Sequence, residues 1–179
     1  TVTDVVQLSV RDLTMVDDFG RTVLDGIDLE IHRGEVLGIA GVEGNGQREL
    51  VEGILAMRPA TGEARLGDVD IAGWATRRRR AAGIGYIPED RHRHGLLLDS
   101  PLWENRILGH TYEDVTVKRG WLNRAGARRD SERIVSEYDV RTPGIDTMAR
   151  ALSGGNQQKF IVGRELSGKP SLLIASHPT

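Results

Sequence analysis

The stretch Val36-Leu37-Gly38-Ile39-Ala40-Gly41-Val42-Glu43-Gly44-Asn45-Gly46 decides the fold of this chain. Residues 36–40 are almost continuously apolar, which is typical of a core strand that is covered on both faces in a parallel sheet. A glycine-rich loop follows directly, and from Gln47 to Met57 apolar residues recur at helical spacing. The sequence therefore predicts a strand, a glycine loop and a helix in immediate succession.

This order is typical of a phosphate-binding loop, which reads Gly-x-x-x-x-Gly-Lys-Ser/Thr. The glycine frame is intact, so backbone N–H groups at the helix start can still face an anion. However, Gln47 replaces the lysine, whose attraction to a phosphate is on the order of several kcal/mol, and Arg48 replaces the metal-holding hydroxyl. A plain strand-to-helix turn, in which the glycines serve only the backbone, is the alternative. We predict weakened, metal-poor nucleotide binding by Gly41, Val42, Glu43, Gly44, Asn45, Gly46, Gln47 and Arg48.

The bulk composition narrows the classes of function. The chain has 179 residues, of which 39% are hydrophobic, as expected for one soluble globular domain. Its net charge of −2 does not favour nucleic acid or an anionic membrane, and the absence of cysteine excludes disulfides and thiolate metal sites. No apolar run approaches the ~20 residues of a transmembrane helix. The run Arg77–Arg80 lacks interleaved aromatic residues, so we interpret it as a solvated helix face and expect no nucleic-acid partner.

The remaining apolar patterns predict strands of two kinds. Alternation of apolar and polar residues is typical of half-buried antiparallel strands, whereas short continuous apolar runs are typical of core strands. Alternating or turn-punctuated stretches lie at 6–11, 27–31 and 62–73. Core-strand candidates lie at 83–87 and 172–175. We therefore expect a mixed sheet and an antiparallel β lobe.

Two helices are predicted between these strands. Ser100 and Pro101 indicate the N-cap and the first residue of a helix that runs through Leu108. The polar segment from Asn123 carries its apolar residues on one face, which is typical of an amphipathic surface helix. Residues 98–150 are thus expected to form a helical lobe.

The string Leu152-Ser153-Gly154-Gly155-Asn156-Gln157-Gln158-Lys159 is the most specific in the chain. Ser153 is a suitable N-cap for a helix that runs through Leu166. Glycine costs about 1 kcal/mol in a helix interior, so two glycines in the first turn indicate that something approaches the backbone there. A hydroxyl and bare N–H groups at a positive helix end suit a terminal phosphate. The alternative is a serine-capped loop whose glycines supply flexibility.

Three ordered motifs together resemble one known family. They are the glycine loop, the run Gly83-Ile84-Gly85-Tyr86-Ile87-Pro88-Glu89-Asp90-Arg91 and the string Leu152 to Lys159. They look like the ATP-binding cassette (ABC) ATPases, and most like the C-terminal, degenerate cassette of the tandem subunits that serve simple-sugar, ribose and nucleoside importers. The resemblance covers nearly the whole chain. It implies an α/β fold of the P-loop NTPase class, with a mixed sheet, an antiparallel β lobe and an α-helical lobe.

The resemblance implies a role for each motif. In this family two cassettes pair head to tail, so the signature of this chain would complete the ATP site of the N-terminal cassette of the same subunit. Glu89 stands at the Q-loop position, Ser176 replaces the metal-associated Walker B aspartate, and His177 replaces the catalytic glutamate. Hydrolysis needs a metal and a carboxylate that orients water, so this chain's own site is expected to be slow or inactive. The signature residues are Leu152, Ser153, Gly154, Gly155, Asn156 and Gln157.

A role for His177 as a substitute base is one interpretation of its position. A polar strand end without chemistry is the favoured one, because the lysine and the metal ligands are also replaced. We therefore assign no catalytic residue and no metal ligand in this chain.

The resemblance also implies a cellular setting. ATP is the expected ligand, with Mg²⁺ in the assembled subunit. Besides the N-terminal cassette, the expected partners are membrane permease subunits, which would dock on the helical lobe near Leu96–Leu98, Pro101 and Trp103. The chain is expected at the cytoplasmic face of the cell membrane, as a peripheral protein.

One cassette is expected to fill the chain and to stop just after the Walker B strand. Its parts would be a β lobe with the first part of the ATP-binding core (1–97), the helical lobe (98–150), and the signature helix with the Walker B strand (151–179). Two other functions stay open. One is a non-hydrolysing nucleotide-binding or regulatory dimerisation module, and the other is a nucleic-acid-associated ABC ATPase, against which the Pro-Glu-Asp-Arg segment argues.

Overall fold

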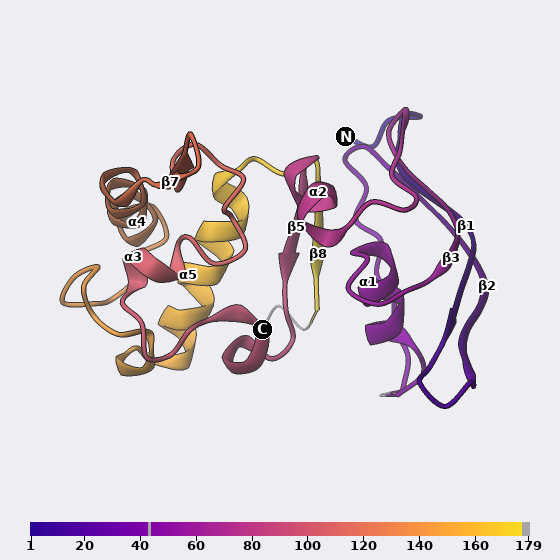
Figure 1. The fold of residues 1–179 in the computed structure, drawn as a ribbon, viewed down its shortest axis with the longest axis horizontal. Helices are drawn as coiled ribbons and strands as arrows, with labels where there is room; N and C mark the ends of the chain where they lie inside the picture. The colour runs from indigo at the N-terminus through magenta and orange to yellow at the C-terminus, as the bar shows by residue number, and fades with distance from the viewer. Residues whose placement is uncertain (43, 177–179) are drawn as a thin grey trace. The chain divides into compact units, whose positions relative to one another are not determined.

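The computed structural model describes every residue except 43 and 177–179 (Figure 1). The chain divides into two compact units, Thr1–Ala82 and Gly83–Thr179. The three-part division expected from the sequence stays a prediction.

The first unit is built on an antiparallel sheet with the strand order β2-β1-β3-β4. Strand β1 is central, and its Val10 lies opposite Leu29 of β2 on one side and Ala64 of β3 on the other. The antiparallel strands predicted from alternation are therefore confirmed. The strands are β1 (Val6–Val16), β2 (Thr22–His32), β3 (Thr61–Leu66) and β4 (Val69–Asp70).

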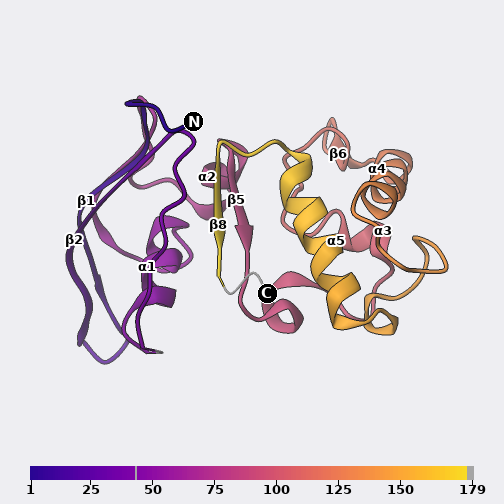
Figure 2. The same ribbon diagram turned by 180° about the vertical axis from the view of Figure 1, so that it is seen from behind.

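Helix α1 (Gln47–Ile54) lies beside this sheet in both views (Figures 1 and 2). Gly53 faces β1, where a Cβ would lie 3.3 Å from Met15 and 3.4 Å from Leu13. The helix ends before Met57, because Ala56 adopts a positive φ of 54° that a right-handed helix cannot contain. The helix predicted after the glycine loop is therefore confirmed, but it is shorter than the predicted range of Gln47 to Met57.

The core strand expected at 36–40 is not formed. These residues join no β-ladder, and the side chain of Val36 is 96% exposed. A parallel strand depends on hydrogen bonds to a neighbour, and the sheet of the first unit is antiparallel and is made by β1 to β4. The prediction was therefore wrong, because an apolar run does not make a strand without a partner edge.

The arginine run lies on helix α2 (Thr76–Ala81) and is only partly solvated. Arg79 is 6% exposed, and its Nη1 donates to the backbone carbonyls of Gly53 at 3.3 Å and Ile54 at 2.7 Å. Its Nε donates to the carbonyl of Trp74. The last carbonyls of a helix lack helical partners, so this guanidinium caps α1. The interpretation of the whole run as a solvated face was therefore wrong for Arg79.

The second unit contains a parallel pair of strands. Ile84 of β5 lies opposite Leu172 of β8, and Ile87 lies opposite Ala175. Both core strands predicted for this part of the chain are confirmed, and their parallel pairing sets their carboxyl ends at one edge. The strands of this unit are β5 (Ile84–Ile87), β8 (Leu172–Ala175) and the hairpin β6 (Val117–Lys118) and β7 (Trp121–Leu122).

Helices pack around one apolar cluster in the second unit. Phe160 and Ile161 of helix α5 (Gly154–Ser167) are fully buried in one cluster with Leu102 and Ile134. The helix predicted from Asn123 is confirmed. Asn123 is its N-cap, and Oδ1 of Asn123 accepts the backbone N–H of Gly126. The helices are η1 (Arg91–Gly95), α3 (Leu102–Asn105), α4 (Arg124–Glu137), η2 (Ala149–Ala151) and α5 (Gly154–Ser167).

Helix α3 is shorter than the predicted helix that ran through Leu108. Pro101 is its N-cap rather than its first residue, and α-helical geometry ends at Asn105. The next backbone bond, from Ile107 to Glu104, has the tighter three-residue spacing. Asn105, the last residue of α3, is buried, and its side-chain amide bonds the backbone N–H and carbonyl of Leu97.

A buried charged network joins α5 to its surroundings. Glu165 is fully buried, and its carboxylate lies 3.1 Å from Nε2 of His110 and 3.1 Å from Nε of Arg164. The same carboxylate accepts the backbone N–H of Tyr86 in β5 at 3.2 Å. On the other side of the imidazole, Nδ1 of His110 lies 2.7 Å from Glu113. The network therefore links the segment after α3, which carries His110 and Glu113, to α5 and β5.

Candidate nucleotide site

The glycine loop turns tightly into helix α1. Gly44 and Gly46 adopt φ values of 88° and 92°, which favour glycine, and the N–H of Asn45 donates to the carbonyl of Val42 at 3.2 Å. Gly46 is the N-cap of α1 and offers no side-chain acceptor to the first N–H groups. The N-cap residue therefore leaves these groups, at the positive end of the helix, without a side-chain cap of its own. Glu43, which we predicted to join this loop, lies outside the described residues.

Gln47 turns back onto its own loop. Its Nε2 donates to the carbonyl of Val42 at 3.2 Å, and a Cβ built on Gly41 would lie only 2.2 Å from that nitrogen. The amide thus lies across the loop where the motif has a lysine. A neutral amide that is bound to the loop itself supplies no positive charge to a phosphate.

Arg48 does not replace the missing charge inside the loop. Its side chain is exposed and its guanidinium lies 3.7 Å from the carboxylate of Glu49 on α1. Over residues 1–42 and 44–176, no cluster of three or more His, Cys, Asp or Glu side chains is arranged to hold a metal ion. The Gln47 side chain is thus directed to the loop backbone, and the Arg48 side chain to α1.

The signature string forms the start of α5. Ser153 is the N-cap, as predicted, and its Oγ accepts from Nδ2 of Asn156 at 3.0 Å and from the backbone N–H of the same residue at 3.4 Å. Leu152 is buried under this turn. Gln157 is 4% exposed, and its Nε2 donates to the carbonyl of Ala149 at 2.9 Å. The string is therefore a rigid helix start and not a flexible loop.

The two glycines of the signature have different surroundings. A Cβ on Gly154 would lie 2.7 Å from Nη2 of Arg91, so the group that approaches this backbone is a protein side chain. Among the residues that the structure describes, a Cβ on Gly155 would meet no atom within 4 Å. Only Gly155 therefore faces open space, into which a ligand could come close to the helix backbone.

The Q-loop and Walker B positions follow the paired strands of the second unit. Glu89 is exposed two residues after β5, and the backbone N–H of Ser176, one residue after β8, donates to the carbonyl of Ile87 at 2.9 Å. Because β5 and β8 are parallel, both positions lie at the same edge. His177 lies outside the described residues.

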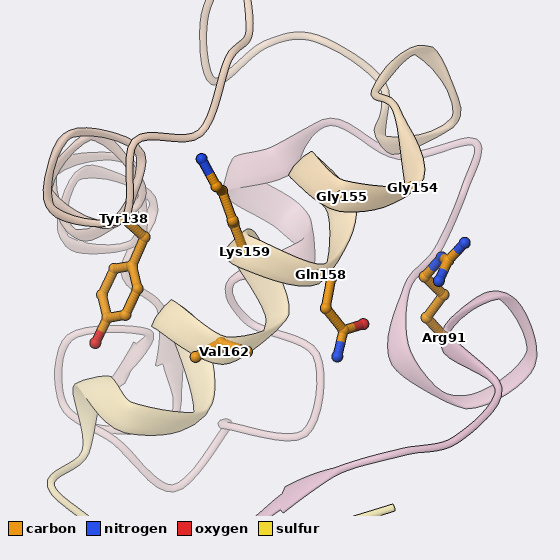
Figure 3. A pocket seen from close by; sticks show the side chains of 7 residues that line it. All are labelled: Arg91, Tyr138, Gly154, Gly155, Gln158, Lys159 and Val162. Atoms are coloured by element: carbon orange, nitrogen blue, oxygen red, sulfur yellow. The ribbon is translucent and has the colours of Figure 1, made fainter. Parts of the chain in front are cut away.

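An open hollow of about 380 Å³ runs along the first two turns of α5 (Figure 3). Arg91 lies at one end and Tyr138 at the other, with Gln158 and Lys159 of α5 between them. Sequence reasoning did not find Arg91 or Gln158. Arg91 does belong to the Pro-Glu-Asp-Arg run, but its approach to α5 depends on segments that are distant in the chain.

Asp90 holds the turn that carries Arg91. Its carboxylate accepts the N–H groups of His92 and Arg93, each at 3.0 Å. The bond from Arg93 is the main reason why the pKa of Asp90 lies below its ordinary value of 3.8. Desolvation opposes this shift, and the N–H of His92 and the charges of His92 and His94 lower the pKa further. A depressed carboxyl pKa means that the charged form stabilises the turn, and that this stability is lost as pH falls.

The protection of the His92 and Arg93 amide protons against hydrogen exchange is therefore expected to fall below pH 3.8. Asp90→Asn keeps an equally good capping oxygen that does not titrate, so its protection should not change over the same range. Hydrogen exchange of both proteins, followed by NMR from about pH 6 to about pH 2, measures this protection. Equal loss of protection in the two proteins would contradict the assignment.

The family comparison agrees with this architecture. The family model described as ABC transporter matches residues 24–179. The chain therefore belongs to the ABC transporter family, and its fold is that of an ABC ATPase, as predicted. The solved ATP-binding cassette MJ0796, described as a dimer in a post-hydrolysis state with ADP and Pi, has a TM-score of 0.76. At 20% identity over 96% of this chain and 74% of that one, it supports the fold alone.

Individual relatives are import ATP-binding proteins. Guanosine import ATP-binding protein NupO of Bacillus subtilis is 43% identical over 96% of this chain and 34% of its own length. Nucleoside import ATP-binding protein NupA of Lactococcus lactis is 38% identical over 97% and 35%, and ribose import ATP-binding protein RbsA 1 of Agrobacterium fabrum is 35% identical over 96% and 32%. The chain thus spans about a third of the length of these relatives.

The surface expected to meet a permease is only partly exposed. Leu96 is buried in the apolar cluster, which corrects its selection as a contact residue, whereas Leu97 is 49% exposed. Pro101 and Trp103 are partly exposed. In the described part of the chain, no helix has the length and apolarity to span a bilayer.

Proposed function

We propose that this chain is the ATP-binding domain of an ABC importer for a nucleoside or a simple sugar. The names of the guanosine, nucleoside and ribose import proteins support this substrate class. The protein would work at the cytoplasmic face of the membrane, attached to permease subunits through the helical lobe. Exposed Leu97 and partly exposed Trp103 supply apolar surface for that contact.

The chain would act as the second, degenerate cassette of a tandem subunit. Gln47 supports this part of the proposal, because its amide is bound to its own loop and brings no charge to a phosphate. Ser176 and His177 stand where Walker B carries its carboxylates. The site on this chain's own loop would therefore bind ATP weakly and hydrolyse it slowly, if at all.

The signature would complete the ATP site of the N-terminal cassette. The observation that carries this proposal is the start of α5, where the Ser153 cap and the open space beside Gly155 leave the helix backbone accessible. Backbone N–H groups at a positive helix end stabilise a terminal phosphate that carries negative charge. In this proposal the signature of the chain serves the ATP site of the partner cassette, whereas the chain's own glycine loop contributes little to ATP hydrolysis.

Ser153→Asp tests the signature without weakening the helix. Aspartate is as good an N-cap as serine, so the stability should be kept, while its charge would repel a phosphate. We expect the ATPase activity of the full-length protein, assembled with its permease, to fall at least about tenfold, and we expect Gln47→Ala to change it less than about twofold.

The exposed serine on α4 provides a control, because Ser136→Asp adds the same charge away from the signature and should leave activity unchanged. Equal effects of Ser153→Asp and Gln47→Ala would argue against the division of labour. No ATPase activity in the unmodified assembly would favour a non-hydrolysing nucleotide-binding module instead.

A further inference from the structure

Arg91 is held in place beside the signature although it lies on a surface turn. Its Nε donates to Oε1 of Gln157 at 3.3 Å, and Nε2 of His92 lies 3.0 Å from the same oxygen. The amide of Gln157 cannot turn round, because its Nε2 is bound to the carbonyl of Ala149. Gln157 therefore fixes the direction in which the Arg91 guanidinium points.

The guanidinium lies against the first turn of α5. Its Nη2 is 2.7 Å from the position that a Cβ on Gly154 would take, and Gly155 next to it faces open space. An anion that comes close to the N–H groups of this turn would therefore also be within reach of Arg91. A guanidinium offers several fixed donors, which suits a phosphate.

The described residues that line the hollow beside this turn are positively charged or neutral. None of the described residues that line it is acidic, and within the described ranges Arg91 forms no ion pair. Nε2 of Gln158 is buried there and has no hydrogen-bond partner among these residues. Lys159 adds a positive charge at the rim, although its Nζ is bound to Asp139. Unpaired buried donors are costly unless a partner binds them, so the hollow is suited to an anionic ligand.

We propose that Arg91 is a further ATP-contacting residue of the signature site, and that Gln157 is the residue that positions it. Arg91 would bind the terminal phosphate of the ATP held by the N-terminal cassette, beside the N–H groups of Gly154 and Gly155. This inference rests on the proposed function of the signature. It also connects the turn after Glu89 to the bound phosphate, because Arg91 belongs to that turn.

The test is the KM for ATP of the full-length protein assembled with its permease. Arg91→Gln keeps a polar side chain and removes the charge, and we expect it to raise the KM about tenfold with a smaller change in kcat. Arg93→Gln, a neutral replacement of an exposed arginine on the same turn, is the matched control and should leave the KM unchanged.

The positioning role of Gln157 is tested by a double variant. Gln157→Leu should raise the KM by itself, but it should add nothing in the Arg91→Gln background, since the residue acts through Arg91. Additive effects would overturn the positioning role. An unchanged KM in Arg91→Gln, with activity still lost in Ser153→Asp, would overturn the role of Arg91 and leave the proposed function intact. An unchanged activity in Ser153→Asp would contradict the proposed function itself.

Discussion

The Gly155→Ala variant is expected to be at least as stable as the unmodified protein and to lose most of its ATPase activity. A Cβ at this position meets no atom of residues 1–42 or 44–176 within 4 Å, so the described part of the fold accommodates it. Alanine is also the better helix former, which adds up to about 1 kcal/mol to the free energy of unfolding. The same methyl group would occupy the space through which a phosphate approaches the helix start. We expect activity to fall at least about tenfold.

Gly163→Ala on the same helix is the matched control for this prediction. There a Cβ would lie 2.6 Å from Cγ2 of Ile134 and 2.8 Å from the ring of Tyr138. Overpacking of this kind typically costs about 1–3 kcal/mol, so the free energy of unfolding should fall. Urea denaturation and steady-state ATPase assays of both variants measure the two effects. Full activity in Gly155→Ala would show that nothing approaches the signature backbone.

The Glu165→Ala variant is expected to be the most destabilised of the charge variants. Glu165 is fully buried, and its removal leaves the buried guanidinium of Arg164 and the backbone N–H of Tyr86 without this acceptor. Breaking a buried ion pair by removing one partner typically costs about 3–5 kcal/mol. We therefore expect a loss of this size in the free energy of unfolding, measured by urea denaturation of the full-length protein.

Asp146→Ala is the control for Glu165→Ala, because it also removes one negatively charged carboxylate, but from the surface. Asp146 binds Arg128 through both carboxylate oxygens, but the two side chains are 69% and 40% exposed. Exposed pairs contribute about 0–1 kcal/mol, so this variant should be nearly as stable as the unmodified protein. If both substitutions cost the same, burial would not control the strength of the network.

Patterns among neighbouring residues predicted much of the fold and part of the site. The N-cap at Ser153 was predicted correctly, because a capping side chain and the helix that it starts are neighbours in sequence. Strands β5 and β8 were also predicted, because a short, continuously apolar run is typical of a buried strand. The same reasoning failed at residues 36–40, where an apolar run has no strand partner in its unit.

Contacts between distant segments could not be predicted. Arg79 looked like one of four solvated arginines, yet it caps α1 because α2 packs beside the end of that helix. Likewise, the order of residues did not predict that the Arg91 side chain lies beside Gly154. Both contacts involve side chains whose partners lie on another element.

The sequence by itself determined that the antiparallel strands, the core strands β5 and β8 and the capped helix α5 form, where the signature lies, and that the phosphate loop lacks its lysine. These properties depend on the order and periodicity of neighbouring residues. Only the tertiary structure decided that Gln47 is bound to its own loop, that Glu165 lies between His110 and Arg164, and that Arg91 reaches α5. Burial and pairing of a charge depend on the side chains that packing brings to it, and these are not encoded in local spacing.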